Sequence, residues 1–191
     1  ALATVYATSM IYASLKSVDA WHLPAVPVNY LLLALACGAV LWLAIRTWAG
    51  VATFMDATLT ATCIGAAGAG KWYYWRTLAR LTPRSTLGSA TGLGTLGAVS
   101  SLSWPHTGQN YLLREMGFEV ARRHAEKLRR IASICAFALP LLLILCSGTI
   151  GGTTASLLMG VAIATLTLGL VVERWLFFAE AKHSVSVFYG R

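Results

Sequence analysis

Charged residues are almost missing from four long stretches of this 191-residue sequence. The stretches cover residues 25–45, 48–70, 131–150 and 153–172, and Asp56 is the one charged residue in them. About 20 apolar residues form a helix that crosses the hydrocarbon core of a bilayer, where every backbone amide must bond within its own segment. We therefore expect four transmembrane helices. With 57% hydrophobic and 12% charged residues, a soluble globular core is excluded.

Acidic residues are also scarce, with 7 Asp and Glu against 15 Lys and Arg, for a net charge of +8. If the apolar segments alternate across the membrane, Lys16, the loop 71–130 and the tail from Glu173 share one face. That face holds fourteen of the fifteen basic residues, and only Arg46 lies on the other. Basic residues near span ends mark the cytoplasmic side. The charge therefore indicates topology rather than nucleic-acid binding, and the loop and C-terminus are predicted to be cytoplasmic.

The first apolar stretch, residues 1–15, lacks an initiator Met and a basic leader, and it is too short to span. We expect it to be the end of a severed helix, with the N-terminal helices of a longer protein missing. The prediction is an all-α fold: residues 1–191 form a single membrane domain, a polytopic transmembrane helix bundle, with an amphipathic helix in the loop 71–130.

Histidine is absent from all the predicted spans, since His22, His106, His124 and His183 fall outside them. A b-type haem needs facing histidines inside a bundle, so we expect no haem in this segment. The four cysteines lie in spans without a CxxC pair, and they are predicted to be packing residues, with no metal site.

The loop 71–130 has three parts. Residues 71–80 mix aromatic and basic residues, as in an interfacial belt, and residues 85–103 are rich in Gly and Ser, which predicts an irregular surface segment. From residue 110 the spacing predicts an amphipathic helix. Its apolar stripe includes Leu112, Met116, Val120 and Leu128, with Leu113, Gly117, Ala121 and Ala125 beside it. His124 is expected in a structural role on the same stripe. Its charged face is expected to include Glu115, Glu119, Arg122, Arg123, Glu126, Arg129 and Arg130.

Three titratable residues are candidates for proton transfer or ligand binding. Asp56 lies eight residues into its predicted span, so it serves a proton or ligand site or pairs with Arg46 near the helix end. Glu180 and His183 would share a face if they lie on one helix, although a solvated ion pair is the alternative. Glu173 and Arg174 mark the membrane boundary or form a packed internal pair. Pro140 predicts a local kink.

Three segments resemble the membrane anchor subunit of bacterial dimethyl sulfoxide reductase. They are PHTGQNYLLREMGFEVARRHAEKLR at 105–129, ERWLFFAEAKHSVSVFYG at 173–190 and ALATVYATSMIYASLKSVDAW at 1–21. The residues that match the family pattern are Pro105, His106, Thr107, Asn110, Tyr111, Glu115, Met116, His124, Arg129, Glu173, Arg174 and Phe178. The chain departs from the family by lacking the preceding helices, where the family's quinol residues lie.

The resemblance implies a multi-pass subunit of the bacterial inner membrane that oxidises menaquinol without haem. Electrons then pass to an iron–sulfur partner subunit and on to a molybdopterin catalytic subunit, so this chain would take part in anaerobic respiration as an electron-transfer subunit without holding the molybdenum site. Two alternatives stay open. A secondary transporter would also have helical hairpins, although no internal repeat is visible, and a purely structural anchor would differ only in lacking a quinol pocket.

Overall fold

A computed structural model describes residues 1–82, 86–102 and 118–184 of the chain. Within these ranges the regular elements are helices, and residues 105–116 of the family pattern lie outside them. In chain order the elements are α1 (Leu2–Ala13), α2 (Ala25–Trp48), α3 (Phe54–Ala79), α4 (Leu87–Thr91), the 3₁₀ turn η1 (Gly94–Leu96), α6 (Glu119–Arg123), α7 (Ala125–Ser133), the π-helical turn η2 (Ile134–Ala138), α8 (Leu139–Ile150) and α9 (Gly152–Ala179). The predicted all-α fold is confirmed.

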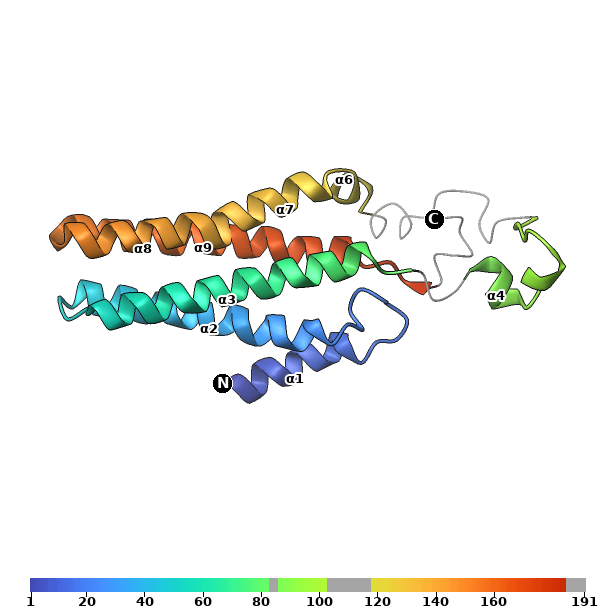
Figure 1. Cartoon of the computed structure of the whole chain (residues 1–191), viewed down its shortest axis with the longest axis horizontal. Helices are drawn as coiled ribbons and strands as arrows, with labels where there is room; N and C mark the ends of the chain where they lie inside the picture. Colours follow the sequence, from blue (N-terminus) through green and yellow to red (C-terminus); the bar gives the residue numbers. More distant parts are fainter. Residues whose placement is uncertain (83–85, 103–117, 185–191) are drawn as a thin grey trace.

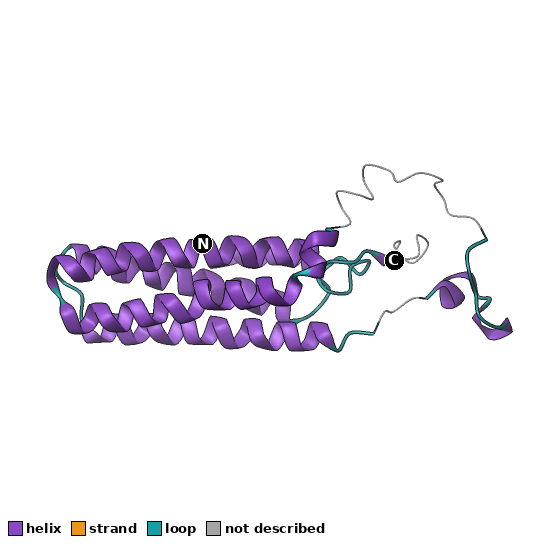
Figure 2. Cartoon of the chain, turned by 90° about the horizontal axis from the view of Figure 1, so that it is seen from above, coloured by secondary structure: helices purple, strands orange, loops and turns teal. Residues whose placement is uncertain are grey.

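The long helices form an antiparallel bundle (Figures 1 and 2). The turns α2–α3 and α8–α9 lie together at one end, which we call the turn end. The C-termini of α3 and α9 and the start of α7 lie at the opposite end, the loop end. Helix α2 packs against α3 and α9, and α8 packs against α9 and α3. Helices α3 and α9 therefore occupy opposite corners and face each other across the centre of the bundle.

Three helices are long and apolar enough to cross a membrane: Ala25–Trp48, Ala125–Ile150 and Gly152–Ala179. They correspond to three of the four predicted full spans. Helix α3 has 26 residues, but it carries Asp56, Lys71 and Arg76 and is not among the three. Helix α1 is a shorter apolar helix that packs against α2.

The predicted boundaries of α3 are wrong at both ends. Trp48 belongs to α2, and α3 begins at Phe54 because Thr53 and Asp56 form a reciprocal capping box at its N-terminus. At the other end α3 continues past Gly70 to Ala79. Residues 71–79, predicted to lie in a loop, are therefore helical, with Trp72 and Tyr73 exposed and Lys71 and Tyr74 buried.

A heptad seam runs along each of the two facing helices. The seam on α9 consists of Ala155, Met159, Ala162, Leu166, Gly169, Glu173 and Leu176. The seam on α3 consists of Thr60, Ile64, Ala67, Lys71 and Tyr74. Spacings of three and four residues keep one stripe turned toward a partner helix. Each seam thus holds one charged residue, near the loop end.

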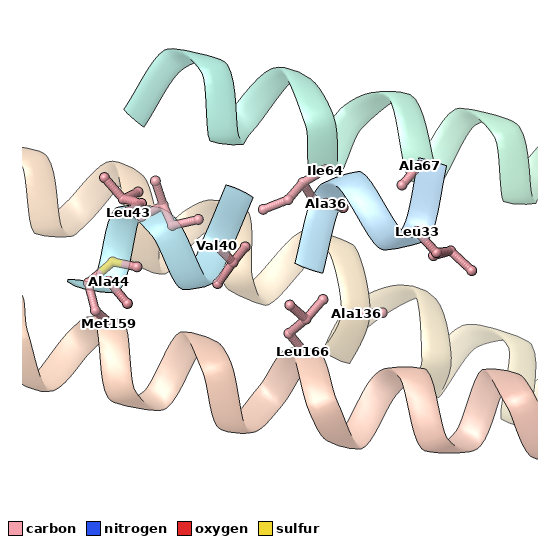
Figure 3. Packing of buried hydrophobic residues seen from close by; sticks show 11 residues of the cluster. Leu33, Ala36, Val40, Leu43, Ala44, Ile64, Ala67, Ala136, Met159 and Leu166 are labelled. Atoms are coloured by element: carbon pink, nitrogen blue, oxygen red, sulfur yellow. The ribbon is translucent and has the colours of Figure 1, made fainter. Parts of the chain in front are cut away.

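Buried apolar residues of the packed helices form the core of the bundle (Figure 3). Leu33, Val40 and Leu43 of α2 meet Ile64 of α3 and Leu166 of α9 in one buried cluster. Small residues bring the backbones close: a Cβ placed on Gly169 would lie 2.3 Å from the backbone nitrogen of Ala136. Such close approach is typical of helix contacts in membranes.

The π-helical turn Ile134–Ala138 ends two residues before Pro140, where the sequence predicts a kink. Proline has no N–H to donate to the preceding turn, and π-helical turns accommodate such interruptions of the α-helical ladder. The four cysteines are half-buried and free, and Cys37 and Cys63 pack against the core as predicted.

The loop contains more structure, and a different amphipathic pattern, than the sequence predicts. Residues 87–91 and 94–96 form α4 and η1 within the Gly- and Ser-rich segment. The amphipathic helix is broken at His124 between α6 and α7. Residues on either side of the break therefore do not continue one stripe along a single helix. Val120 is 71% exposed, so its predicted place on the apolar stripe is wrong, whereas Ala121, expected beside that stripe, is buried.

Candidate functional site

Three charged side chains meet inside the bundle near the loop end. The Lys71 Nζ of α3 reaches across the bundle to Glu173 Oε1 of α9. The Glu173 carboxylate also accepts hydrogen bonds from Arg174, at 2.5 Å from Nε to Oε2 and 2.9 Å from Nη2 to Oε1. We call these three residues the charge cluster. Its two cations and one carboxylate carry a net charge of +1.

Two of the three residues of the charge cluster, Lys71 and Glu173, are deeply buried. Lys71 is 1% exposed and Glu173 is fully buried, while the Arg174 side chain is 29% exposed. Glu173 lies six residues before the end of α9, which corresponds to a depth of about 9 Å along the helix axis. Buried charges are costly and are found in membrane helices where they pair or serve a site. Of the two interpretations of Glu173 and Arg174, the packed internal pair is correct.

Aromatic rings surround the two cations. The Lys71 ammonium lies 4.2 Å from the centre of the Tyr74 ring, and the Arg174 guanidinium lies 4.5 Å from that of Tyr30. Phe177 contacts both cations, at 5.8 Å and 4.9 Å. The negative faces of aromatic rings attract cations where water is excluded, so the rings partly replace the lost hydration.

An unsatisfied acceptor lies beside the charge cluster. Asn29 of α2 is 3% exposed; its Nδ2 donates to the Ala25 carbonyl at 2.9 Å, and its Oδ1 is buried without a hydrogen-bond partner among the described residues. A gap too narrow for a water molecule lies between these groups and is lined by Val26, Asn29, Tyr30, Lys71, Tyr74, Arg174 and Phe177. The residues around this closed gap thus combine two cations, aromatic rings and one unsatisfied acceptor.

A loop closes one side of this region. The Trp21 Nε1 donates to the Phe177 carbonyl at 3.0 Å, and the Tyr74 hydroxyl donates to the Ala20 carbonyl at 3.2 Å. Trp21 stacks on Phe177, with ring centres 5.8 Å apart. The aromatic residues therefore hold the segment between α1 and α2 over the charge cluster.

Asp56 lies at the opposite end of the bundle and is used structurally. Its Oδ2 accepts from the Thr53 backbone nitrogen at 2.8 Å, from the Thr53 hydroxyl at 2.6 Å and from Arg46 Nε at 2.8 Å. Trp42 Nε1 donates to Oδ1 at 3.3 Å. Since Asp56 is in the first turn of α3 and not eight residues inside a helix, the expected pairing with Arg46 is the one observed.

Glu180 and His183 do not share a helix face, because α9 ends at Ala179. Glu180 pairs with Arg129 of α7 at 2.7 Å. His183 is exposed and lies in a short backbone bridge with Val18. The helical arrangement expected for this pair is wrong, although both residues lie at the loop end with the charge cluster.

Arginines of α6 and α7 bind the C-terminus of α9. The Arg122 side chain donates to the carbonyls of Ala179 and Ala181 at 2.8 Å and 3.2 Å. Cations at a helix C-terminus complement its dipole and its unpaired carbonyls. Arg122 and Arg129 therefore do not face away from the bundle as predicted.

A larger cleft of about 570 Å³ lies at the turn end, between the two interhelical turns. Its wall includes Leu43, Thr47, Trp48, Phe54, Ser147 and Ser156. The residues that line it are apolar or neutral, so it offers no acid, base or cation to a ligand. Among the described residues no group of three or more His, Cys, Asp and Glu side chains could hold a metal ion.

Sequence reasoning assigned Lys71 to an interfacial belt and did not single out Asn29. The heptad spacing was available as a signal, because Lys71 follows Thr60, Ile64 and Ala67 at intervals of four, three and four residues. A charge on such a seam points inward. Asn29 sits on the corresponding stripe of α2, between Val26 and Leu33.

The chain is similar to a protein from Allochromatium vinosum that is named as a subunit of sulfite dehydrogenase. The two are 31% identical over 191 residues, which covers 98% of this chain and 57% of that protein. The chain thus spans little more than half the length of its relative. No family model and no solved structure matches the chain. The relative is named for a sulfite dehydrogenase and not for a dimethyl sulfoxide reductase.

Proposed function

We propose that this chain is part of a membrane subunit of an oxidoreductase complex. In this proposal the subunit transfers electrons between an iron–sulfur partner subunit and a quinone dissolved in the bilayer. The similarity to the sulfite dehydrogenase protein along nearly the whole chain carries the proposal. The three helices able to cross a membrane are consistent with it.

The relative's name favours quinone reduction as the direction. A dehydrogenase withdraws two electrons from its substrate, and a quinone that takes up two electrons and two protons becomes a quinol. Sulfite would be the electron donor, oxidised by a molybdopterin catalytic subunit. The chain's own residues would bind and orient the quinone ring and hold protons near its oxygens.

Menaquinol oxidation is the second candidate. The segments 1–21, 105–129 and 173–190 favour it, because they resemble the anchor of a reductase that draws electrons from menaquinol. The two candidates share a quinone site and differ only in the direction of electron flow. In both, the basic loop end would face the cytoplasm at the bacterial inner membrane.

Purification of the whole complex tests the proposal. The full-length subunit, tagged on the chromosome, is extracted from membranes in mild detergent, and its partners are identified by mass spectrometry with iron and molybdenum analysis. We expect an iron–sulfur protein and a molybdenum protein to copurify, and sulfite to reduce ubiquinone-1 or menadione. A subunit that purifies alone, together with undiminished sulfite and quinol activities in membranes of a deletion strain, would contradict the proposal.

A further inference from the structure

We infer that the outer face of α3 at the loop end binds the phosphate of an anionic phospholipid. The site consists of Trp72 and Arg76 of α3 and of Arg80, which ends the helix. These three residues are spaced four apart, so they share one face, and we call them the outer patch. The ligand is a component of the bilayer, so the site does not depend on the direction in which electrons flow.

The two cations of the outer patch have no counter-charge. Trp72 is 57% exposed, and Arg76 and Arg80 are exposed as well. The Arg76 guanidinium lies 4.5 Å from the centre of the Trp72 ring, so the two side chains stay together on the surface. Within residues 1–82, 86–102 and 118–184, no carboxylate pairs with either arginine and no acceptor bonds to Trp72 Nε1. The outer patch therefore offers positive charge and hydrogen-bond donors to a ligand.

The turn end contains the same pair of residue types together with an acceptor. Trp42 and Arg46 are also four residues apart, on α2, and the Arg46 guanidinium lies 5.4 Å from the centre of the Trp42 ring. The Asp56 carboxylate accepts from Trp42 Nε1 at 3.3 Å and from Arg46 Nε at 2.8 Å. An indole and a guanidinium in this arrangement thus bind one anionic group through its two oxygens. The described residues provide no such group to Trp72 and Arg76, and a phosphodiester has the charge and the oxygens to take its place.

The depth of the outer patch matches the phosphate layer of a bilayer. Helix α3 has 26 residues, or about 39 Å, which exceeds the roughly 30 Å hydrocarbon core by about 9 Å. If this excess is divided equally, the boundary of the core lies about three residues from each helix end. Arg76 is three residues before Ala79, the last residue of α3, and Trp72 lies one turn deeper. Tryptophan is enriched at this level, and arginine side chains reach from it to the headgroups.

The surface of α3 next to the outer patch suits acyl chains. Toward the turn end, the same side of the helix exposes the uncharged residues Leu59, Thr62, Ala66 and Ala69. The other side of α3 packs against α2 and α8. A lipid whose chains lie along this uncharged surface places its phosphate at the outer patch.

The charge of the outer patch favours an anionic lipid over a zwitterionic one. A zwitterionic headgroup also has a phosphate, but its own cation competes with the arginines for that phosphate. Basic side chains near a membrane surface attract anionic lipid, which is abundant in the cytoplasmic leaflet, and the loop end is the one proposed to face the cytoplasm. A partner protein is the competing occupant. The uncharged surface that continues from the outer patch along α3 favours lipid.

Photolabelling with a lipid tests the site. The full-length subunit, with the partners that it retains, is reconstituted into phosphatidylcholine vesicles that contain a small fraction of phosphatidylglycerol with a diazirine in its headgroup. After irradiation and chymotrypsin digestion, labelled peptides are mapped by mass spectrometry. We expect labels in 72–80 that unlabelled phosphatidylglycerol suppresses, whereas the same amount of added phosphatidylcholine leaves them in place. Equal suppression by the two lipids, or no label in 72–80, would overturn the inference.

Variants give a second readout. Arg76→Gln removes one cation, and we expect the labelling of 72–80 to fall about 5-fold. Arg76→Lys should retain more of the labelling, because it keeps the charge and loses only the planar fork of donors. Trp72→Phe keeps an aromatic ring and removes the N–H, which should lower the labelling about 2- to 5-fold. Arg46→Gln at the turn end is the matched control, expected to leave the labelling of 72–80 unchanged. Wild-type labelling in Arg76→Gln would overturn the inference.

A separate crosslinking experiment detects a partner protein on the same face. Tyr73 is 62% exposed beside the outer patch, and the photoreactive variant Tyr73→benzoylphenylalanine crosslinks to whatever covers it. We expect lipid adducts. A crosslink to another polypeptide would assign this face to a protein interface and overturn the lipid site. If Arg76→Gln fails to assemble, Trp72→Phe and the lipid competition on the unchanged subunit decide, because neither changes a charge.

Discussion

The two ends of the bundle use similar side chains for different purposes. At the turn end, Arg46 pairs with Asp56 beside Trp42, and backbone and hydroxyl groups of Thr53 donate to the same carboxylate. At the loop end, Glu173 is shared by Lys71 and Arg174. The two carboxylates differ in burial and in their partners. The Asp56 carboxylate binds a helix N-terminus and stabilises a turn. The Glu173 carboxylate is buried, and its charge is compensated by the two cations beside it.

The largest expected effect is the loss of the buried carboxylate. Glu173→Gln leaves Lys71 and Arg174 inside the bundle without a counter-charge, and removal of one partner from a buried ion pair costs about 3–5 kcal/mol. We expect the assembled subunit to fall to a small fraction of the wild-type level on membrane immunoblots. Asp56→Asn, the matched change at the turn end, should reduce assembly far less. Equal losses for the two variants would remove the distinction between the ends.

The next largest effect is expected from helix packing, for which two glycines of α9 can be compared. Gly169→Ala places a Cβ against the Ala136 backbone, which cannot yield, and overpacking of this kind costs about 1–3 kcal/mol. Gly160→Ala, closer to the turn end, meets no atom within 4 Å and should be neutral or stabilise by up to about 1 kcal/mol. Thermal melting of the purified complex compares them. A lower melting temperature for Gly160→Ala than for Gly169→Ala would show that the helices are packed differently.

Capping at the turn end should have an intermediate effect. Thr53→Ala removes the hydroxyl that accepts from the Asp56 backbone nitrogen and donates to Asp56 Oδ2, and loss of an N-cap costs about 0.5–2 kcal/mol. Thr53→Ser keeps the hydroxyl and is the control. We expect faster proteolysis in the α2–α3 turn for the Ala variant alone. No change in the Ala variant would mean that Asp56 and Arg46 hold the turn without the cap.

The smallest effect is expected for an exposed pair at the loop end. Glu126 and Arg130 form an i,i+4 ion pair on α7, with both side chains largely exposed. Such pairs contribute about 0.3–0.5 kcal/mol, so Glu126→Gln should change the melting temperature barely above experimental error. A loss comparable to that of Glu173→Gln would show that α7 is covered by another part of the protein.

The fold was predictable from the sequence because apolar stretches of sufficient length admit few structures in a bilayer. Positions 25–45, 131–150 and 153–172 lie within helices that meet the criteria for a membrane span. The ends were less predictable. A search for uncharged residues stops at Gly70 because Lys71 follows, whereas the helix continues to Ala79.

The candidate site was harder to predict, because its members are scattered along the chain. Asn29, Lys71 and Glu173 lie on three different helices, and only the packing of these helices brings them together. Asp56 drew attention as an isolated acid in an apolar stretch, but Thr53 three residues earlier is the signature of a capping box. Heptad spacing predicts that the side chains of Lys71 and Glu173 face the bundle interior. It does not predict that they pair, because they lie on different helices.

A charge exchange tests the central claim, that Lys71 and Glu173 form a buried pair while Asp56 serves a cap. Lys71→Glu and Glu173→Lys alone should each abolish assembly, and the double variant should restore it to at least about half the wild-type level, because the opposite charges again face each other. The double variant Arg46→Asp/Asp56→Arg should assemble no better than either of its single variants, because an arginine at position 56 cannot accept a hydrogen bond from the Thr53 backbone nitrogen. Single Lys71 and Glu173 variants that assemble normally, or a double variant no better than either, would contradict the buried pair.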